Sequence, residues 1–223
     1  MRKYIFFFLV LIGIPSVSLG ATEPFLFLTW NARSYVPDSY LGKIIPGPNS
    51  PIIVSLEAIQ DGKIADLRSS TIKWYVDGEL FSSVVGQKSF TIRAPKRLTS
   101  GIMSIRAEVV DKWDRIKMKT VDIPLSPPLV VLKSNYLSRS FGENKISVSA
   151  SPYFFGTTNL SDLIFSWKVN GQSVGSAENP QVLDIEFNRD AEPGSSISVE
   201  AFVSNPNGVQ ESASKRESFK YIP

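Results

Sequence analysis

Residues 72–78 read IKWYVDG, and residues 165–171 read FSWKVNG. Each stretch alternates apolar and polar residues around a tryptophan and ends in Asp-Gly or Asn-Gly. Such alternation indicates a β-strand with one buried face, and the closing dipeptide favours a tight hairpin turn. Trp74 and Trp167 are 93 residues apart, a spacing that fits one small β-domain. The chain is therefore expected to contain the same β-domain twice.

Further strands repeat at matching positions of the two copies. Apolar residues recur at every second position in four pairs of segments: 54–58 with 146–150, 72–76 with 165–169, 90–94 with 183–187, and 103–109 with 197–203. First strands are expected at residues 25–30 and 129–132, and last strands at 116–121 and 214–221, the final one as a polar, exposed edge. No segment after residue 20 shows a helical period. The pattern predicts an all-β chain of two tandem β-sandwiches.

The boundary between the two domains is expected at residues 124–128, which read PLSPP. Three prolines in five residues disfavour a strand ladder and favour an extended connector. The predicted organisation is a signal segment at residues 1–20, domain 1 at 22–125, a proline linker at 126–128 and domain 2 at 128–223.

The first twenty residues resemble a secretory signal. Arg2 and Lys3 precede an apolar run over residues 4–14, and the small residues Ser18 and Gly20 precede an expected cut at Ala21. This run is shorter than the about 20 apolar residues that span a bilayer. A cleaved signal is expected, with an uncleaved membrane anchor as the alternative. The protein is therefore expected outside the cell, on its surface or in the periplasm.

Composition restricts the chemistry that this chain can perform. The 223 residues include no histidine and no cysteine, so Ser-His-Asp, Cys-His and zinc-histidine mechanisms cannot be built from it. Without Arg2 and Lys3, the chain has 22 basic and 21 acidic residues. Because the basic residues are not concentrated in one part of the sequence, the sequence does not predict nucleic-acid binding. We expect no enzyme activity, no cofactor and no metal. An exported sandwich without disulfides favours a bacterial source.

The tryptophan motif carries a family resemblance. A Trp on the third strand, then an apolar residue and an Asp-Gly or Asn-Gly turn, resembles immunoglobulin-like and PKD-like modules of exported bacterial surface proteins. Residues 103–111, MSIRAEVVD, are similar to the alternating sixth strand of such modules. The resemblance implies two tandem immunoglobulin-like β-sandwich domains after the signal segment. It also implies a spacer, adhesion or recognition role without shared catalytic residues.

Trp74 and Trp167 are interpreted as structural core residues, because a buried indole removes about 150–250 Å² of surface from water. Trp113 is different, since residues 111–115, DKWDR, should form a loop tip. A tryptophan there is a candidate partner contact, because interface hot spots are enriched in Trp. It could also fold back onto a neighbouring loop. The two aspartates of this loop are interpreted as a charged hairpin tip rather than a calcium site.

Two aromatic segments are further candidates for partner contact. Residues 31–49 are long for a sandwich connection and contain Tyr35 and Tyr40; they form either a binding loop or a segment packed along the sandwich edge or against domain 2. Tyr153 and Phe154 belong to a run of three aromatic residues. This run either covers the end of the sandwich or forms an exposed patch for a partner.

Three functions remain open at this stage. The first is an exported spacer, adhesion or protein-interaction module, whose partner is a protein or glycan at the cell surface. The second is a soluble carbohydrate- or ligand-binding module. The third is a periplasmic assembly chaperone, which the similarity of the two halves disfavours.

Overall fold

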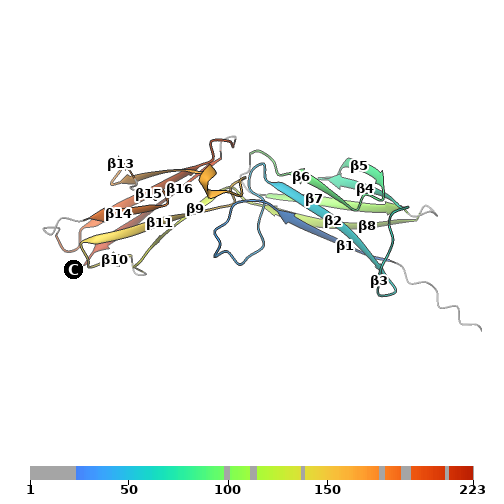
Figure 1. The fold of residues 1–223 in the computed structure, drawn as a ribbon, viewed down its shortest axis with the longest axis horizontal. Helices are drawn as coiled ribbons and strands as arrows, with labels where there is room; N and C mark the ends of the chain where they lie inside the picture. The colour runs from blue at the N-terminus through green and yellow to red at the C-terminus, as the bar shows by residue number, and fades with distance from the viewer. Residues whose placement is uncertain are drawn as a thin grey trace, which may run out of the picture.

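The computed structural model describes residues 24–97, 101–110, 115–136, 139–175, 179–186, 192–208 and 211–222. It confirms the predicted fold class: the chain is all-β and forms two immunoglobulin-like β-sandwiches, which lie end to end along the long axis of the molecule (Figure 1). Each sandwich has its own core of buried apolar side chains. The predicted signal segment lies outside the described residues.

Domain 1 consists of two sheets. One contains β1 (Phe25–Ala32), β2 (Pro51–Gln60), β3 (Lys63–Ile64) and β6 (Ser89–Arg93), with β2 pairing to the other three. The other has the order β5-β4-β7-β8, from β4 (Thr71–Val76), β5 (Glu79–Val85), β7 (Gly101–Val110) and β8 (Ile116–Leu125). All their pairings are antiparallel.

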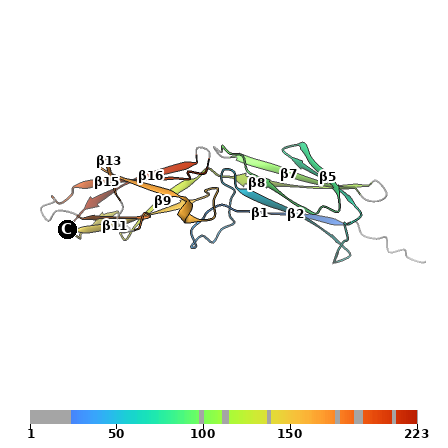
Figure 2. The ribbon, with the colours of Figure 1, turned by 45° about the horizontal axis from the view of Figure 1, so that its top comes forward.

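Domain 2 repeats this plan. Its smaller sheet has the order β14-β11-β9, from β9 (Leu129–Ser134), β11 (Lys145–Tyr153) and β14 (Val182–Glu186). Its larger sheet has the order β10-β16-β15-β12-β13, from β10 (Ser140–Phe141), β12 (Ile164–Val169), β13 (Gln172–Val174), β15 (Ser196–Ser204) and β16 (Ser212–Tyr221). A short 3₁₀ turn, η1 (Leu160–Asp162), precedes β12. The two views agree that the sandwiches are joined only at their ends (Figure 2).

Two expectations about strands need correction. The prolines of residues 124–128 are expected to disfavour a strand ladder, but Pro124 belongs to β8 and pairs with Ile102. β8 is an edge strand, which tolerates a missing N–H on its outer side. The last strand of domain 2 is only partly an exposed edge. Its end pairs in parallel with β10, and Phe219 and Tyr221 are buried there.

The two central tryptophans occupy equivalent places in the two cores. Trp74 is fully buried and Trp167 is 2% exposed. The indole Nε1 of Trp74 donates to the carbonyl oxygen of Gln87 at 3.0 Å, and that of Trp167 donates to Pro180 at 2.9 Å. Because a buried N–H without an acceptor is costly, these bonds make burial of the whole indole favourable.

The hairpin turn after each tryptophan strand is also duplicated. Asp77 and Asn170 both have φ 49°, and the glycines after them have φ 88° and 83°. These left-handed conformations suit Asp, Asn and Gly and form a type I′ turn. The side-chain Oδ1 of each turn residue accepts a hydrogen bond from a strand amide, Ser104 in domain 1 and Ser198 in domain 2. The motif therefore ties β4 to β7 and β12 to β15.

Replacement of either tryptophan by alanine should unfold the domain that contains it. Truncation of a buried Trp costs about 3–5 kcal/mol, a large part of the about 5–15 kcal/mol of a typical domain. Hydrogen exchange read by mass spectrometry should show Trp74→Ala losing protection in β2, β4 and β7, and Trp167→Ala in β11, β12 and β15. Each variant is the control for the other. Far-ultraviolet dichroism melts within a degree or two of wild type would contradict the expectation.

Candidate functional site

Four of the five aromatic residues predicted as partner contacts come together where the two domains meet: Tyr35, Tyr40, Tyr153 and Phe154. The Tyr35 amide donates to the Phe155 carbonyl at 2.8 Å, and the Phe154 amide donates to the Tyr35 carbonyl at 2.7 Å. These two bonds form an isolated antiparallel bridge between domain 1's long loop and domain 2. The Tyr35 side chain packs against the domain 2 core, in which Phe155 is fully buried.

Side-chain rings extend this junction. The Tyr40 ring lies edge-on to the rings of Tyr153 and Phe154, at centroid distances of 6.0 and 5.9 Å. Phe154 has φ 60°, an uncommon conformation for a bulky residue. Its buried ring and its amide bond to domain 1 hold it there. Of the interpretations of residues 31–49, these contacts therefore favour a segment that packs against domain 2 over a free binding loop.

Two glycines allow the backbones to approach closely. A Cβ atom on Gly47 would lie 1.7 Å from the Phe154 carbonyl oxygen, and one on Gly156 would lie 2.2 Å from the Pro48 carbonyl oxygen. Each glycine belongs to one domain and meets the other domain's main chain. No side chain fits at either position without moving that backbone, so the two loops interlock.

Buried polar groups hold the two loops in shape. On the domain 1 side, Ser34 and Ser50 share a buried hydrogen bond of 2.8 Å, and the Gly47 amide donates to the Ser34 hydroxyl. The linker joins this arrangement, because the Ser126 amide donates to the Pro46 carbonyl at 3.1 Å. The loop and linker are thereby fixed together.

On the domain 2 side, the key polar residue is Glu211, which is only 3% exposed. Its carboxylate accepts hydrogen bonds from the amide of Gly156 and from Nδ2 of Asn205. Burial raises the pKa of Glu211 above its ordinary value, and the two hydrogen bonds oppose this rise. Glu211 therefore holds in place the glycine that meets domain 1.

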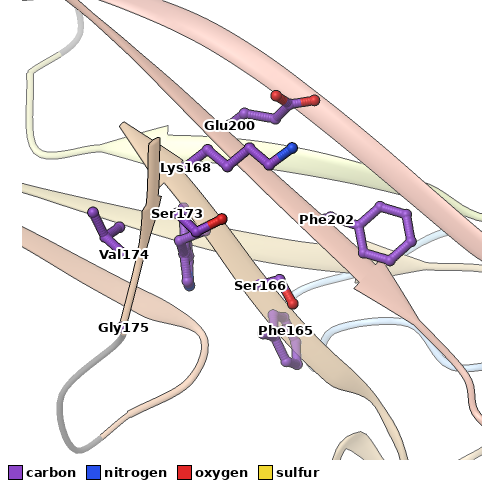
Figure 3. A pocket seen from close by; sticks show the side chains of 9 residues that line it. Phe165, Ser166, Lys168, Ser173, Val174, Gly175, Glu200 and Phe202 are labelled. Atoms are coloured by element: carbon purple, nitrogen blue, oxygen red, sulfur yellow. The ribbon is translucent and has the colours of Figure 1, made fainter. Parts of the chain in front are cut away.

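A second candidate site is a shallow cavity of about 410 Å³ on the outer face of the large domain 2 sheet. Figure 3 shows Lys168, Glu200 and Phe202 around it, with Ser166 and Ser173 as small residues between them. The side chains come from β12, β13 and β15. A concave surface with an apolar ring and a few polar groups suits a small polar ligand.

The charges at this cavity are partly neutralised. Arg216 Nη2 donates to Glu200 Oε2 at 2.7 Å. This hydrogen bond, with the positive charges of Arg216 and Lys168, holds the pKa of Glu200 below its ordinary value. Glu200 therefore stays a carboxylate at neutral pH and can accept hydrogen bonds from a ligand.

The corresponding outer face of domain 1 is occupied by its own side chains. The Arg106 guanidinium lies 4.2 Å from the Tyr75 ring centroid, and the Tyr75 hydroxyl donates to Glu108. Arg106 Nε is within 3.3 Å of Glu108 Oε1, which is ion-pair distance without hydrogen-bond geometry. Domain 2 has Lys168, Glu200 and Phe202 at these positions of the repeat, with the small residue Ser166 opposite Phe202.

The sequence does not predict this cavity, because the alternation of residues 197–203 indicates only that Glu200 lies on the outward, solvated face of its strand. The available signal was Phe202, an aromatic residue at an outward position of an alternating strand. Trp113 and the aspartates of its loop lie outside the described residues. Among the residues that the structure describes, no group of three or more acidic side chains is placed to hold a metal ion. No helix in this part of the chain is long and apolar enough to cross a membrane.

No protein-family model matches the chain, and no curated protein matches it. Solved structures do match. The fibronectin(III)-like modules of CbhA from Clostridium thermocellum share 16% identity over 88% of this chain and 93% of theirs, with a TM-score of 0.33. Three N-terminal domains of the bacteriophage RB49 outer capsid protein Hoc share 13% identity over 89% of this chain and 59% of theirs, with a TM-score of 0.43.

A third match is the Bacteroides ovatus protein SGBP-B of a mixed-linkage glucan utilization locus, solved in complex with a mixed-linkage heptasaccharide. It shares 15% identity over 86% of this chain and 47% of its own, with a TM-score of 0.26. The chain thus spans about half the length of the second and third proteins. At such identities these likenesses concern the β-sandwich fold alone.

The interlocked glycines predict which change separates the domains. Gly156→Val should push the Pro48 carbonyl away and break the Tyr35–Phe155 bridge, while both cores stay folded. Hydrogen exchange at the Tyr35 and Phe154 amides should rise at least about tenfold. Gly101→Val is the matched control, because a Cβ atom there meets nothing within 4 Å. Unchanged protection of both amides in Gly156→Val would contradict the interlock.

Proposed function

We propose that this protein is an exported, non-catalytic module that acts by contact, as a spacer, adhesion or protein-interaction unit. The observation that carries the proposal is the interlocked junction between Tyr35, Phe154 and the two glycines. A chain that works through contact at a distance needs domains that keep one orientation. The junction supplies that property, which a three-residue linker alone would not.

The junction is built to be rigid rather than reactive. Its contacts are main-chain hydrogen bonds, aromatic rings and close backbone approaches, and its one buried carboxylate, Glu211, is occupied by two donors. Relative domain motion is the usual expectation for tandem domains with small interfaces. In this protein, motion of one domain relative to the other would break the Tyr35–Phe155 bridge and at the same time expose buried aromatic surface.

Asp184 is an acidic residue outside the junction that also has structural partners. Asp184, on an outward face, accepts from the Ser147 hydroxyl and pairs with Lys145 at 3.0 Å. The hydrogen bond from Ser147, then that from Lys145, lowers the pKa of Asp184. A carboxylate held this way is a poor proton donor, which fits a solvated face rather than a hydrolytic site.

Export and surface exposure are tested on intact cells of the native host. Protease shaving followed by mass spectrometry should release peptides from the outer strands, such as β8 and β16, before the cells lyse. A cytoplasmic marker protein measured in the same sample is the control. Detection of the protein only after lysis, together with a retained residue 1–20 segment, would overturn the proposal.

The cavity beside Phe202 favours a second candidate function, a carbohydrate- or ligand-binding module. Phe202 offers a ring face to a sugar, and Lys168 and Glu200 offer a donor and an acceptor to its hydroxyl groups. Trp167 also lines this cavity, so its fluorescence can report occupancy.

Ligand binding at this cavity should depend on Phe202. Glycans selected on an array with the mature chain should change its tryptophan fluorescence on titration, and Phe202→Ala should weaken binding about tenfold, or 1.4 kcal/mol. Met118→Ala is the control, since Met118 is an exposed apolar residue on the outer face of domain 1. A flat array and a flat titration would exclude this second function.

A further inference from the structure

The two copies of the repeat differ on one lateral side of the sandwich. In domain 1, the hairpin after the tryptophan strand continues into β5, a strand of seven residues. In domain 2 the equivalent strand, β13, has three residues. Figures 1 and 2 both place β5 at the margin of domain 1. Because the shared core cannot explain this difference, the longer strand needs its own explanation.

β5 is an edge strand with the composition of an interior strand. It pairs with β4 on one side, and among the described residues no strand pairs with its other side. Leu80 and Val85 are 58% and 59% exposed and stand opposite Tyr75 and Thr71, on the outer face. Val84, 48% exposed, stands opposite the buried Ile72. Apolar residues on both faces are typical of a strand whose two faces are covered, and at an exposed edge they favour pairing with another strand.

A bulge near the start of β5 orients one more apolar residue. The register shifts between Trp74 and Tyr75, which makes Phe81 the extra residue of β5. Its ring lies 5.0 Å from that of Phe90, on the core side, but remains 50% exposed. From Ser82 to Val85 the ladder is regular, so this part of the edge is geometrically ready to pair.

Several other edge strands that the structure describes are protected in ways that β5 is not. β8 carries Lys117 and Lys119, and β16 carries Lys215, Arg216 and Glu217. β13 is too short to pair extensively, and the edges of β1 and β9 lie against β8 and β16. Charges, short strands and covered edges are the usual means of preventing edge-to-edge pairing. Leu80–Val85 has no charged residue at all.

The charges at the two ends of β5 indicate which strand pairs with it. Glu79 begins β5, and Lys88 follows its end; both are exposed. If two copies of β5 pair antiparallel about a twofold axis, each Glu79 comes close to Lys88 of the second copy. A parallel arrangement would instead bring like charges together. The residues of β5 between Glu79 and Lys88 are uncharged. The twofold axis, which passes through the middle of the strand pair, therefore brings no two like charges together.

We propose that β5 is a homodimerisation strand, which pairs antiparallel with β5 of a second copy and joins the two β5-β4-β7-β8 sheets into one. Main-chain hydrogen bonds between the edges supply the pairing, and burial of Leu80, Phe81, Val84 and Val85 supplies the hydrophobic contribution. Because one strand pair is a small interface, the dimer is reversible.

Sedimentation equilibrium of the mature chain, residues 21–223, tests this pairing. Wild type should change from monomer to dimer between about 1 μM and about 1 mM. Val85→Lys should raise the dimer dissociation constant at least about tenfold, because it puts a charge on the outer face of the pairing edge. Val174→Lys, the same substitution at the last residue of β13 in domain 2, should leave dimerisation unchanged.

Charge reversal tests the antiparallel arrangement. Glu79→Lys and Lys88→Glu should each weaken the dimer several-fold, because each places like charges together at both ends of the strand pair. The double variant restores both pairs with opposite polarity and should dimerise like wild type. Wild type that stays monomeric throughout overturns the proposal, as does a dimer insensitive to Val85→Lys. A dimer that ignores both reversals overturns the twofold antiparallel geometry.

Discussion

Each sandwich depends on the burial of one indole whose N–H must find an acceptor. The bond from Trp74 to Gln87, and from Trp167 to Pro180, reaches the loop just before β6 or β14. Those strands belong to the opposite sheet. A single side chain therefore fills the space between the sheets and fixes where the chain crosses from one sheet to the other. The hairpin turn beside it ties the same strand to its other neighbour.

This shared constraint leaves the loops and edges free to differ, and the molecule uses them differently in its two halves. Domain 1 contributes the loop of Ser34 to Ser50, which shapes the junction, and domain 2 contributes the turn of Phe154 to Gly156. The two segments stabilise each other, since Phe154 has a left-handed conformation and makes hydrogen-bond and ring contacts across the junction. The junction is a property of the pair, not of either module.

The strand pattern, the turns and the core could be predicted from the sequence because they depend on local periodicity and on Asp-Gly or Asn-Gly chemistry. The short strand β10 and the edge strands β3, β5 and β13 could not, since they carry little alternation and form only by pairing with a neighbour. The meeting of Tyr40 with Phe154 joins residues more than a hundred positions apart, which no local pattern reveals. Gly47 and Gly156 also read as ordinary loop glycines until the opposing backbone is in place.

Rigidity of the junction matters most if the molecule acts as more than one copy. The strands of domain 1 run roughly along the long axis (Figure 1), so antiparallel pairing through β5 would direct the two copies of domain 2 in opposite directions. With a flexible linker, those two ends would take many separations. With the interlocked junction, the two copies of domain 2 are held at one separation. Two weak contacts, one from each copy, can then bind one target together, because the effective concentration of the second contact depends on how well this separation matches the target. The effect of pairing through β5 on the separation of the two copies of domain 2 thus depends on the interlocked junction, although the two features lie at different places in domain 1.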